Sequence, residues 1–226
     1  MDVDDFIREY PEIWHMAERG SWPKILRDGL LSTAALLDLY QVQAEERRRL
    51  ESCRRASSET IAHATTSEKA VLRDNRPITE ALLCKRLTGG MKPADWYRLL
   101  NRHVFFWVER KDLQGFLRTY GDAEQDVITV DTGELVERDV DQIAITPFNT
   151  GSMRRPSEYE RGPETFARIR DFDLQYWRAR IRHRRPIVEL AVEYKLVNVG
   201  DVAVCVERWY RDELRETVWV RNSAGT

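Results

Sequence analysis

Two apolar segments near the end of the chain constrain its fold more than any other feature. Residues 186–197, PIVELAVEYKLV, and residues 201–210, DVAVCVERWY, are rich in the β-branched and aromatic side chains that pack well in sheets, so both are expected to be strands. Residues 103–107, HVFFW, predict a buried strand, and residues 126–149 predict two strands around a helical turn. Because these strands alternate with helical segments, the expected fold class is α/β (α+β).

The first half of the chain predicts mainly helices. A short strand around Ile13–Met16 leads into a helix that Ser21 caps and Gly29 ends. The leucine spacing over residues 32–55 favours a longer helix, and the polar residues 56–70 predict a loop. Further helices are expected from Thr79, over residues 93–102, directly after HVFFW and over residues 173–185.

Residues 149–172 are rich in Gly, Pro, Ser and charge and have no clear period. A loop of this length inside a compact domain is usually functional or mobile, so we expect it near the functional site. Its first residues, Asn149, Thr150 and Gly151, predict a turn, for which a structural role is favoured over substrate binding.

Length and composition predict one folded domain over residues 1–226. The formal net charge of −2 arises because 36 basic side chains nearly balance 38 acidic ones, so local clusters of charge are more informative than the total. The three cysteines lie far apart without zinc-ligand spacing, so neither a disulfide framework nor a metal site is expected.

Several classes of protein have no support in the sequence. The acidic start, MDVDDFIREYP, lacks the order of a secretion signal, and no apolar run has transmembrane length, so a cytoplasmic protein is expected. A nuclease or RNA-processing domain built around the arginine clusters is not supported, because there are neither paired histidines nor carboxylates with metal-ligand spacing.

Three segments, in the same order along the chain, resemble parts of one family. Residues 13–32, IWHMAERGSWPKILRDGLLS, are similar to the opening of ADP-ribosyltransferases, where a strand with a Tyr/Trp-His sequence leads into a short helix ending in Gly-Leu. HVFFW resembles their middle strand, and residues 186–204 resemble the late strand that carries the catalytic glutamate. The order indicates a DarT-like ADP-ribosyltransferase. This resemblance implies a split, strongly twisted β core with flanking helices.

The resemblance implies that Glu189 is catalytic and that His15 binds NAD, the co-substrate. A carboxylate near the ribose 2′-hydroxyl offsets the positive charge that develops when the nicotinamide bond breaks, and a neutral histidine can bind the adenosine ribose. Glu193 lies on the same face of an ideal strand and competes with Glu189. The family's frequent stacking tyrosine is absent, which leaves HVFFW, including Trp107, to stack on nicotinamide. Further NAD contacts are expected from Met16, Ser32, Phe105 and Phe106.

Arginines form two clusters with open roles. In DarT-like enzymes an arginine between the first helix and the middle strand assists catalysis; Arg48 and Arg73 are the candidates here, although the cluster around Arg48 also fits a solvated helical face. The second cluster precedes the Glu189 strand and is suited to nucleic-acid phosphates, to the NAD pyrophosphate or to pairing with carboxylates. Its candidate nucleic-acid-binding residues are Arg178, Arg180, Arg182, Arg184 and Arg185.

The expected function is NAD-dependent mono-ADP-ribosyl transfer to a nucleic-acid base or, less favoured, to a protein side chain. The expected partners are NAD and a DNA or RNA acceptor, and toxins of this kind often have an antitoxin or immunity protein. The alternative is a catalytically inactive module of the same fold that binds nucleotide or nucleic acid. Release of nicotinamide separates the two functions.

Overall fold

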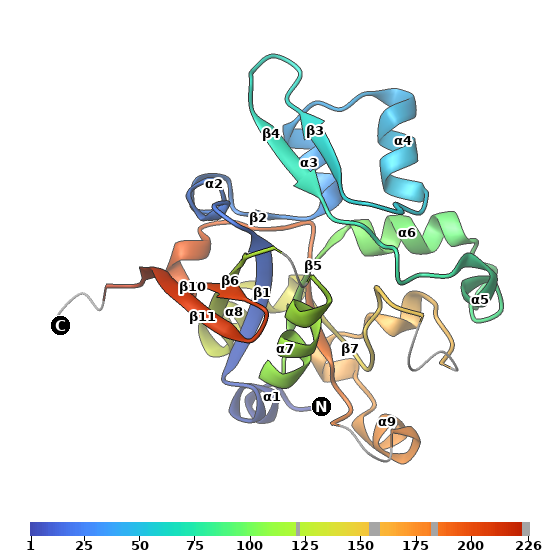
Figure 1. Cartoon of the computed structure of the whole chain (residues 1–226). Helices are drawn as coiled ribbons and strands as arrows, with labels where there is room; N and C mark the ends of the chain where they lie inside the picture. Colours follow the sequence, from blue (N-terminus) through green and yellow to red (C-terminus); the bar gives the residue numbers. More distant parts are fainter. Residues whose placement is uncertain (121–122, 154–158, 182–184, 223–226) are drawn as a thin grey trace.

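The computed structural model describes residues 1–120, 123–153, 159–181 and 185–222 (Figure 1). Within these residues a seven-stranded antiparallel sheet is flanked by helices, which confirms the mixed α/β class expected from the sequence. In spatial order the strands are β11 (Glu213–Val220), β10 (Ala203–Tyr210), β6 (Gln125–Asp131), β1 (Glu12–Glu18), β5 (His103–Trp107), β8 (Glu189–Glu193) and β7 (Ile143–Thr146).

The sheet is split between β1 and β5. β1 pairs with β6 along its whole length, from Glu12 to Glu18. By contrast, its ladder with β5 consists of one pair, Trp14 with Trp107. Beyond this pair the two strands diverge, so the half of the sheet that ends in β11 separates from the half that ends in β7.

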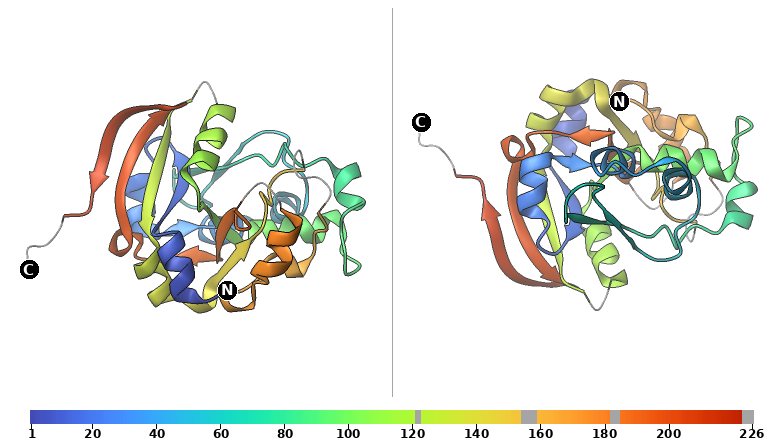
Figure 2. Two further views of the ribbon diagram at one scale, coloured as in Figure 1. Left: turned by 90° about the horizontal axis from the view of Figure 1, so that it is seen from below. Right: turned by 90° about the horizontal axis from the view of Figure 1, so that it is seen from above.

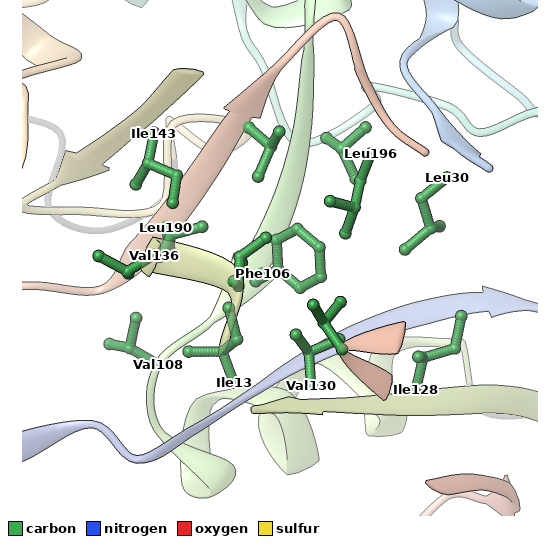
Figure 3. Packing of buried hydrophobic residues seen from close by; sticks show 14 of the residues in the cluster. Ile13, Leu30, Phe106, Val108, Ile128, Val130, Val136, Ile143, Leu190 and Leu196 are labelled. Atoms are coloured by element: carbon green, nitrogen blue, oxygen red, sulfur yellow. The ribbon is translucent and has the colours of Figure 1, made fainter. Parts of the chain in front are cut away.

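Each face of the sheet is covered by helices, as the alternation of side chains along β1 requires. On one face, Leu113 and Leu117 of α7 (Arg110–Thr119) pack with Met16. On the other face, Ile13 and Phe106 belong to the largest hydrophobic cluster (Figure 3). The helices that contribute to this cluster are α1 (Val3–Glu9), α2 (Trp22–Asp28) and α8 (Thr132–Asp139).

The chain between β2 (Leu30–Leu31) and β5 builds a second group of elements beside the sheet. In Figure 1, α3, α4 and the hairpin β3–β4 lie together at the top, and both views of Figure 2 place α5 at the opposite end of the molecule from β10 and β11. The elements are α3 (Thr33–Leu39), α4 (Ala44–Ser52), β3 (Glu59–Ala62), β4 (Lys69–Leu72), α5 (Glu80–Cys84) and α6 (Pro93–Asn101). Separate hydrophobic clusters, around Leu37 and around Trp96, hold this group together.

Many of the expected elements are confirmed. Ser21 and Gly29 flank α2 at its N-cap and C-cap positions, and Thr79 directly precedes α5. Strands occur at HVFFW (β5) and on both sides of α8 (β6 and β7). The 3₁₀ turn η1 (Val140–Gln142) directly follows α8 and precedes β7. The helix expected in residues 173–185 is α9 (Leu174–Arg180).

Other expectations were wrong. The single helix over residues 32–55 is two helices, because Gln41, between them, and Ala44, at the start of α4, have positive φ angles of 56° and 37°. The loop over residues 56–70 contains most of the β3–β4 hairpin. The strand expected over residues 186–197 ends at Glu193; Tyr194, with a φ of 64°, separates it from β9 (Lys195–Leu196). Neither α1 nor β11 was expected from the sequence.

The long loop at residues 149–172 is partly described. Residues 154–158 lie outside the described residues, and the remainder contains the 3₁₀ turns η2 (Pro163–Thr165) and η3 (Ile169–Asp171). A further 3₁₀ turn, η4 (Val199–Asp201), precedes β10. In the described part of the chain, no helix has the length and apolar character needed to cross a membrane, and the three cysteines are free.

Gly29 is expected to be essential for the contact between β2 and β9. Its φ of 91° and ψ of 171° suit glycine, and an added Cβ would lie 2.6 Å from the carbonyl oxygen of Leu196. Gly29→Ala should therefore lower the free energy of unfolding by about 3 kcal/mol, measured by denaturant titration. Gly90→Ala is the control, because Gly90 has a φ of 73° but an added Cβ would meet no atom within 4 Å. This substitution should lower the free energy of unfolding by about 1 kcal/mol. Equal losses would contradict the close approach to Leu196.

Candidate active site

A cleft of about 660 Å³ opens where β1 and β5 diverge. One wall is formed by β1, β5 and the start of β8, with His15, Phe105 and Glu189 among the lining residues. Residues 69–77, in β4 and directly after it, supply another wall, and residues 149–152 after β7 also line the cleft. Segments from distant parts of the sequence therefore meet at the split in the sheet.

The side chain of His15 bridges the two strands beyond the end of their backbone ladder. Its Nδ1 lies 2.8 Å from the carbonyl oxygen of Phe105. Because a carbonyl oxygen only accepts, Nδ1 carries the proton, and Nε2 is an acceptor without a partner among the described residues. Burial lowers the pKa of His15 to about 4, and the charge of Arg73 acts in the same direction. The ring is therefore neutral at neutral pH.

Glu189 begins β8, where it pairs with Trp107 of β5 and Thr146 of β7 and is only 5% exposed. Three donors converge on its Oε2: the amide of Thr150 at 3.0 Å, the hydroxyl of Thr150 at 2.8 Å and the hydroxyl of Thr146 at 3.1 Å. Oε1 accepts no hydrogen bond from the described residues. Because Glu189 lines the cleft, Oε1 is the oxygen available to a ligand.

Burial raises the pKa of the Glu189 carboxyl to about 7, while the threonine donors and the charge of Arg161 oppose the shift. The carboxyl is thus near the midpoint of its titration at neutral pH. A strongly shifted carboxyl in a cleft is typical of functional sites.

Arg161 supplies a buried positive charge near the glutamate. Its guanidinium lies over the ring of Phe148, with Cζ 4.6 Å from the centroid, and donates to the carbonyl oxygens of Tyr159 at 2.8 Å and Ser152 at 3.0 Å. These bonds connect the turn after β7 to a later part of the long loop. They therefore hold in place the turn that donates to the glutamate.

Arg73 follows β4 and lines the same cleft. Its Nη2 donates to Oε1 of Gln125 at 2.6 Å and lies 3.5 Å from Oε1 of Glu18, and its Cζ is 4.9 Å from the centroid of the Tyr120 ring. Its Nη1 is buried and has no partner among the described residues. A buried donor without an acceptor is costly, so this atom is suited to an acceptor on a ligand, such as a phosphate oxygen.

Arg55 and Asn101 fix the backbone that carries Arg73. Arg55 is 6% exposed and donates to the carbonyl oxygen of Arg73 at 2.9 Å, to that of Leu50 at 2.6 Å and to Oδ1 of Asn101 at 3.0 Å. The amide of Asn101 donates to the carbonyl oxygen of Glu51 at 2.8 Å. Each guanidinium nitrogen of Arg55 therefore has a protein acceptor, and the side chain supports the wall of the cleft.

The structure brings most of the residues proposed from the sequence into this cleft. Those that line it are His15, Met16, Ser32, Arg73, Phe105, Phe106 and Glu189. Ser32 also caps α3, because its Oγ accepts the amide of Ala35 at 3.2 Å. The ring of Phe106 is 0% exposed and lies in the hydrophobic core (Figure 3), so Phe105 and Trp107, both partly exposed, are better placed to stack on a ligand.

The position of the cleft distinguishes the two candidate arginines, Arg48 and Arg73, and the two candidate glutamates, Glu189 and Glu193. Arg48 lies exposed on α4 and does not line the cleft, whereas Arg73 does. Glu193, at the other end of β8 from Glu189, also lies outside the lining residues and pairs with Arg102 at 3.1 Å. The cleft therefore selects Arg73 and Glu189 as the residues that can reach a ligand bound there.

The described members of the second arginine cluster do not line the cleft. Arg178 and Arg180 are exposed on α9, and neither has a carboxylate partner among the described residues. Arg185 pairs with Glu109 at 3.1 Å. Arg182 and Arg184 lie outside the described residues.

Three residues that act on Glu189 or Arg73 were missed in the sequence. Thr146 had one available signal, because it is a polar residue at the end of the apolar run IAIT. Arg161 and Tyr120 had none: Arg161 lies in a segment without periodicity, and Tyr120 directly follows a helix. Only the folded chain places these side chains beside the glutamate and Arg73.

The charge of the cleft favours an anionic ligand. Of its lining residues in the described part of the chain, six are lysine or arginine and four are aspartate or glutamate. No group of three or more His, Cys, Asp or Glu side chains within the described ranges could hold a metal ion.

Comparison with known proteins identifies a family and distant similarity to a solved structure. A sequence model of the family of unknown function DUF7002 matches residues 11–203. No curated protein matches the chain. Among solved structures, Thermosipho africanus DarTG in complex with ADP-ribose is similar at 17% sequence identity and a TM-score of 0.40, over 87% of this chain and 43% of that one. The chain thus spans less than half the length of that relative.

Replacing Glu189 is expected to stabilise the protein at alkaline pH. A carboxyl with a pKa raised from 4.5 to about 7 stabilises the folded state fully below pH 4.5, and this contribution is lost as the pH rises through 7. Relative to the wild type, Glu189→Gln should therefore gain about 3 kcal/mol in free energy of unfolding between pH 4 and pH 8, measured by denaturant titration. Glu193→Gln, the control, should show no such gain. If the free energy of unfolding depends on pH in the same way in Glu189→Gln and in the wild type, burial does not shift the pKa of the carboxyl.

Proposed function

Because the chain belongs to the family of unknown function DUF7002, we propose its function from the cleft itself: it is an NAD-dependent mono-ADP-ribosyltransferase. The observation that carries this proposal is the presence, in one cleft, of Glu189 with an unpaired Oε1 and of neutral His15 with an unpaired Nε2. The segments around both residues resemble DarT-like enzymes, which supports the same reaction.

Glu189 would act on the bond between ribose C1′ and the nicotinamide nitrogen. Nicotinamide leaves with the bonding electron pair, and the ribose develops oxocarbenium character. Oε1 of Glu189 accepts a hydrogen bond from the 2′-hydroxyl, and the carboxylate charge stabilises the developing positive charge. The acceptor forms a new bond to C1′ and loses a proton. Since only the ionised carboxyl does this, a pKa of about 7 makes the rate rise with pH through neutrality.

The remaining lining residues are suited to hold the dinucleotide. Nε2 of His15 accepts a hydrogen bond from a hydroxyl of the adenosine ribose, which the neutral ring allows and an imidazolium would not. Nη1 of Arg73 donates to an anionic oxygen of the pyrophosphate. Phe105 and Trp107 are partly exposed aromatic residues on which nicotinamide stacks.

A nucleic-acid base is the proposed acceptor. The observation that favours it is the exposure of Arg178 and Arg180 without carboxylate partners in the described part of the chain, because such cations are available to phosphates. The guanidinium of Arg180 lies over the ring of Tyr176, with Cζ 3.6 Å from the centroid. A protein side chain is the less favoured acceptor. Replacing Arg178 and Arg180 by uncharged residues should weaken transfer to nucleic acid and leave nicotinamide release unchanged.

The proposal is tested by incubating the purified protein with NAD that is labelled in its adenylate moiety. DNA, RNA or a protein mixture is added as acceptor, each in a separate reaction. We expect release of nicotinamide and transfer of label to nucleic acid. Binding of NAD without release would favour the inactive nucleotide-binding module. Folded protein that neither binds NAD nor releases nicotinamide would contradict both functions.

Glu189→Gln keeps the shape of the side chain and removes its charge. Transfer should fall by about 10²–10³, the scale for losing one electrostatic stabiliser of a transition state, while the affinity for NAD changes little. Glu193→Gln is the matched control on the same strand and should retain transfer. The opposite result for the two variants would show that the wrong glutamate has been assigned.

Arg73→Gln tests which arginine serves the cleft. Loss of a charge-assisted hydrogen bond should weaken NAD binding by about tenfold or more, measured by calorimetry. Arg48→Gln, on the exposed face of α4, should leave the affinity unchanged within about twofold. If Arg48→Gln alone weakens binding, NAD does not bind in this cleft.

A further inference from the structure

The hydrogen bonds to the Glu189 carboxylate are distributed unequally between its two oxygens. All three donors, two from Thr150 and one from Thr146, point to Oε2. Oε1, in contrast, has no donor among the described residues. A carboxylate has about two acceptor positions on each oxygen, so this arrangement saturates one oxygen and leaves the other to the cleft.

We propose that Thr146 and Thr150 are positioning residues for the reaction: they hold Oε2 so that Oε1 alone faces the substrate, and their donated hydrogen bonds favour the charged form of the buried carboxyl. The inference rests on the proposed function for the role of Glu189. Its electrostatic part, however, can be measured in the protein without any substrate.

The two threonines have different capacities. Thr150 is 1% exposed, and both its backbone amide and its hydroxyl donate to the carboxylate. The Thr146 hydroxyl lies 3.1 Å from Oε2 but also 3.0 Å from the carbonyl oxygen of Phe148. A hydroxyl has one proton, so Thr146 can donate to the charged carboxylate or to the carbonyl. Thr150 is therefore the stronger of the two in stabilising the charge.

The surroundings leave few other groups that could stabilise the charge. β5 presents Trp107 beside Glu189, β7 presents Thr146, and the turn after β7 presents Thr150. The charged side chain that acts on the carboxyl is Arg161. Burial raises the pKa of Glu189 and the threonine donors lower it, so removal of a donor moves the pKa further up.

The test uses four variants of the full chain. Thr150→Val keeps the shape and removes the hydroxyl; Thr150→Ser keeps the hydroxyl. Thr146→Val removes the weaker donor and provides a second measurement if Thr150→Val does not fold. Thr132→Val is the matched control, because Thr132 is a buried threonine outside the cleft whose hydroxyl has no partner among the described residues.

Two readouts separate positioning from general stability. The first is the pKa of the Glu189 carboxyl, measured by carbon NMR. The titrating carboxyl resonance of Glu189 is assigned because it is absent from the spectrum of Glu189→Gln. The second is the pH profile of nicotinamide release. Thr150→Val should raise the pKa by about one unit, so that release falls about fivefold at pH 7 and recovers by about pH 9. Thr146→Val should cause a smaller shift in the same direction, and Thr150→Ser and Thr132→Val should leave the pKa close to the wild-type value.

An unchanged carboxyl pKa in Thr150→Val would overturn the proposal, as would a loss of release that is equal at all pH values. If Thr150→Val is unfolded, an unchanged pKa in Thr146→Val overturns it. A wild-type protein that releases no nicotinamide contradicts the proposed function, but the NMR measurement still decides whether the threonines stabilise the charged carboxyl.

Discussion

The hydrogen bond between the His15 ring and the carbonyl oxygen of Phe105 is the interaction on which the cleft depends. It spans β1 and β5 just after their single backbone pair, where the sheet divides. The bond fixes the tautomer of the ring, and burial keeps it neutral. A continuous ladder at this point would close the sheet and leave no room for a ligand. The split and the histidine that bridges it therefore create the site together.

Burial acts on the two principal residues of the cleft in opposite ways. It lowers the pKa of His15 and raises that of Glu189, so each side chain is held in its neutral form over part of the pH range in which water would leave it charged. The stability that depends on His15 is present above pH 6.5 and is lost as the pH falls toward 4, whereas that of Glu189 is lost as the pH rises through 7. The charged form of Glu189 therefore lowers the stability of the folded protein, and buried carboxyls with strongly shifted pKa values are typical of functional sites.

The sequence predicts the elements with strong local signals and fails where tertiary contacts decide. The cap residues Ser21 and Gly29 and the apolar run HVFFW are local signals, and their elements are confirmed. The strands of the β3–β4 hairpin have only four residues each, with one buried residue in each, so neither is long enough to show a clear alternation in the sequence. Within the cleft, His15 and Glu189 follow from the family resemblance. The donors to Glu189 and the buried charge of Arg161 depend on a turn and a loop without periodicity, so the sequence alone does not assign them.

A crystal structure of the protein with bound NAD tests the central claim most directly, because the position of one molecule reports on every residue of the cleft. The account predicts that the nicotinamide ribose lies with its 2′-hydroxyl within hydrogen-bond distance of Oε1 of Glu189. It also places the adenosine ribose at Nε2 of His15 and the pyrophosphate at Nη1 of Arg73. NAD bound elsewhere, with the space between β1 and β5 filled by solvent, would contradict it.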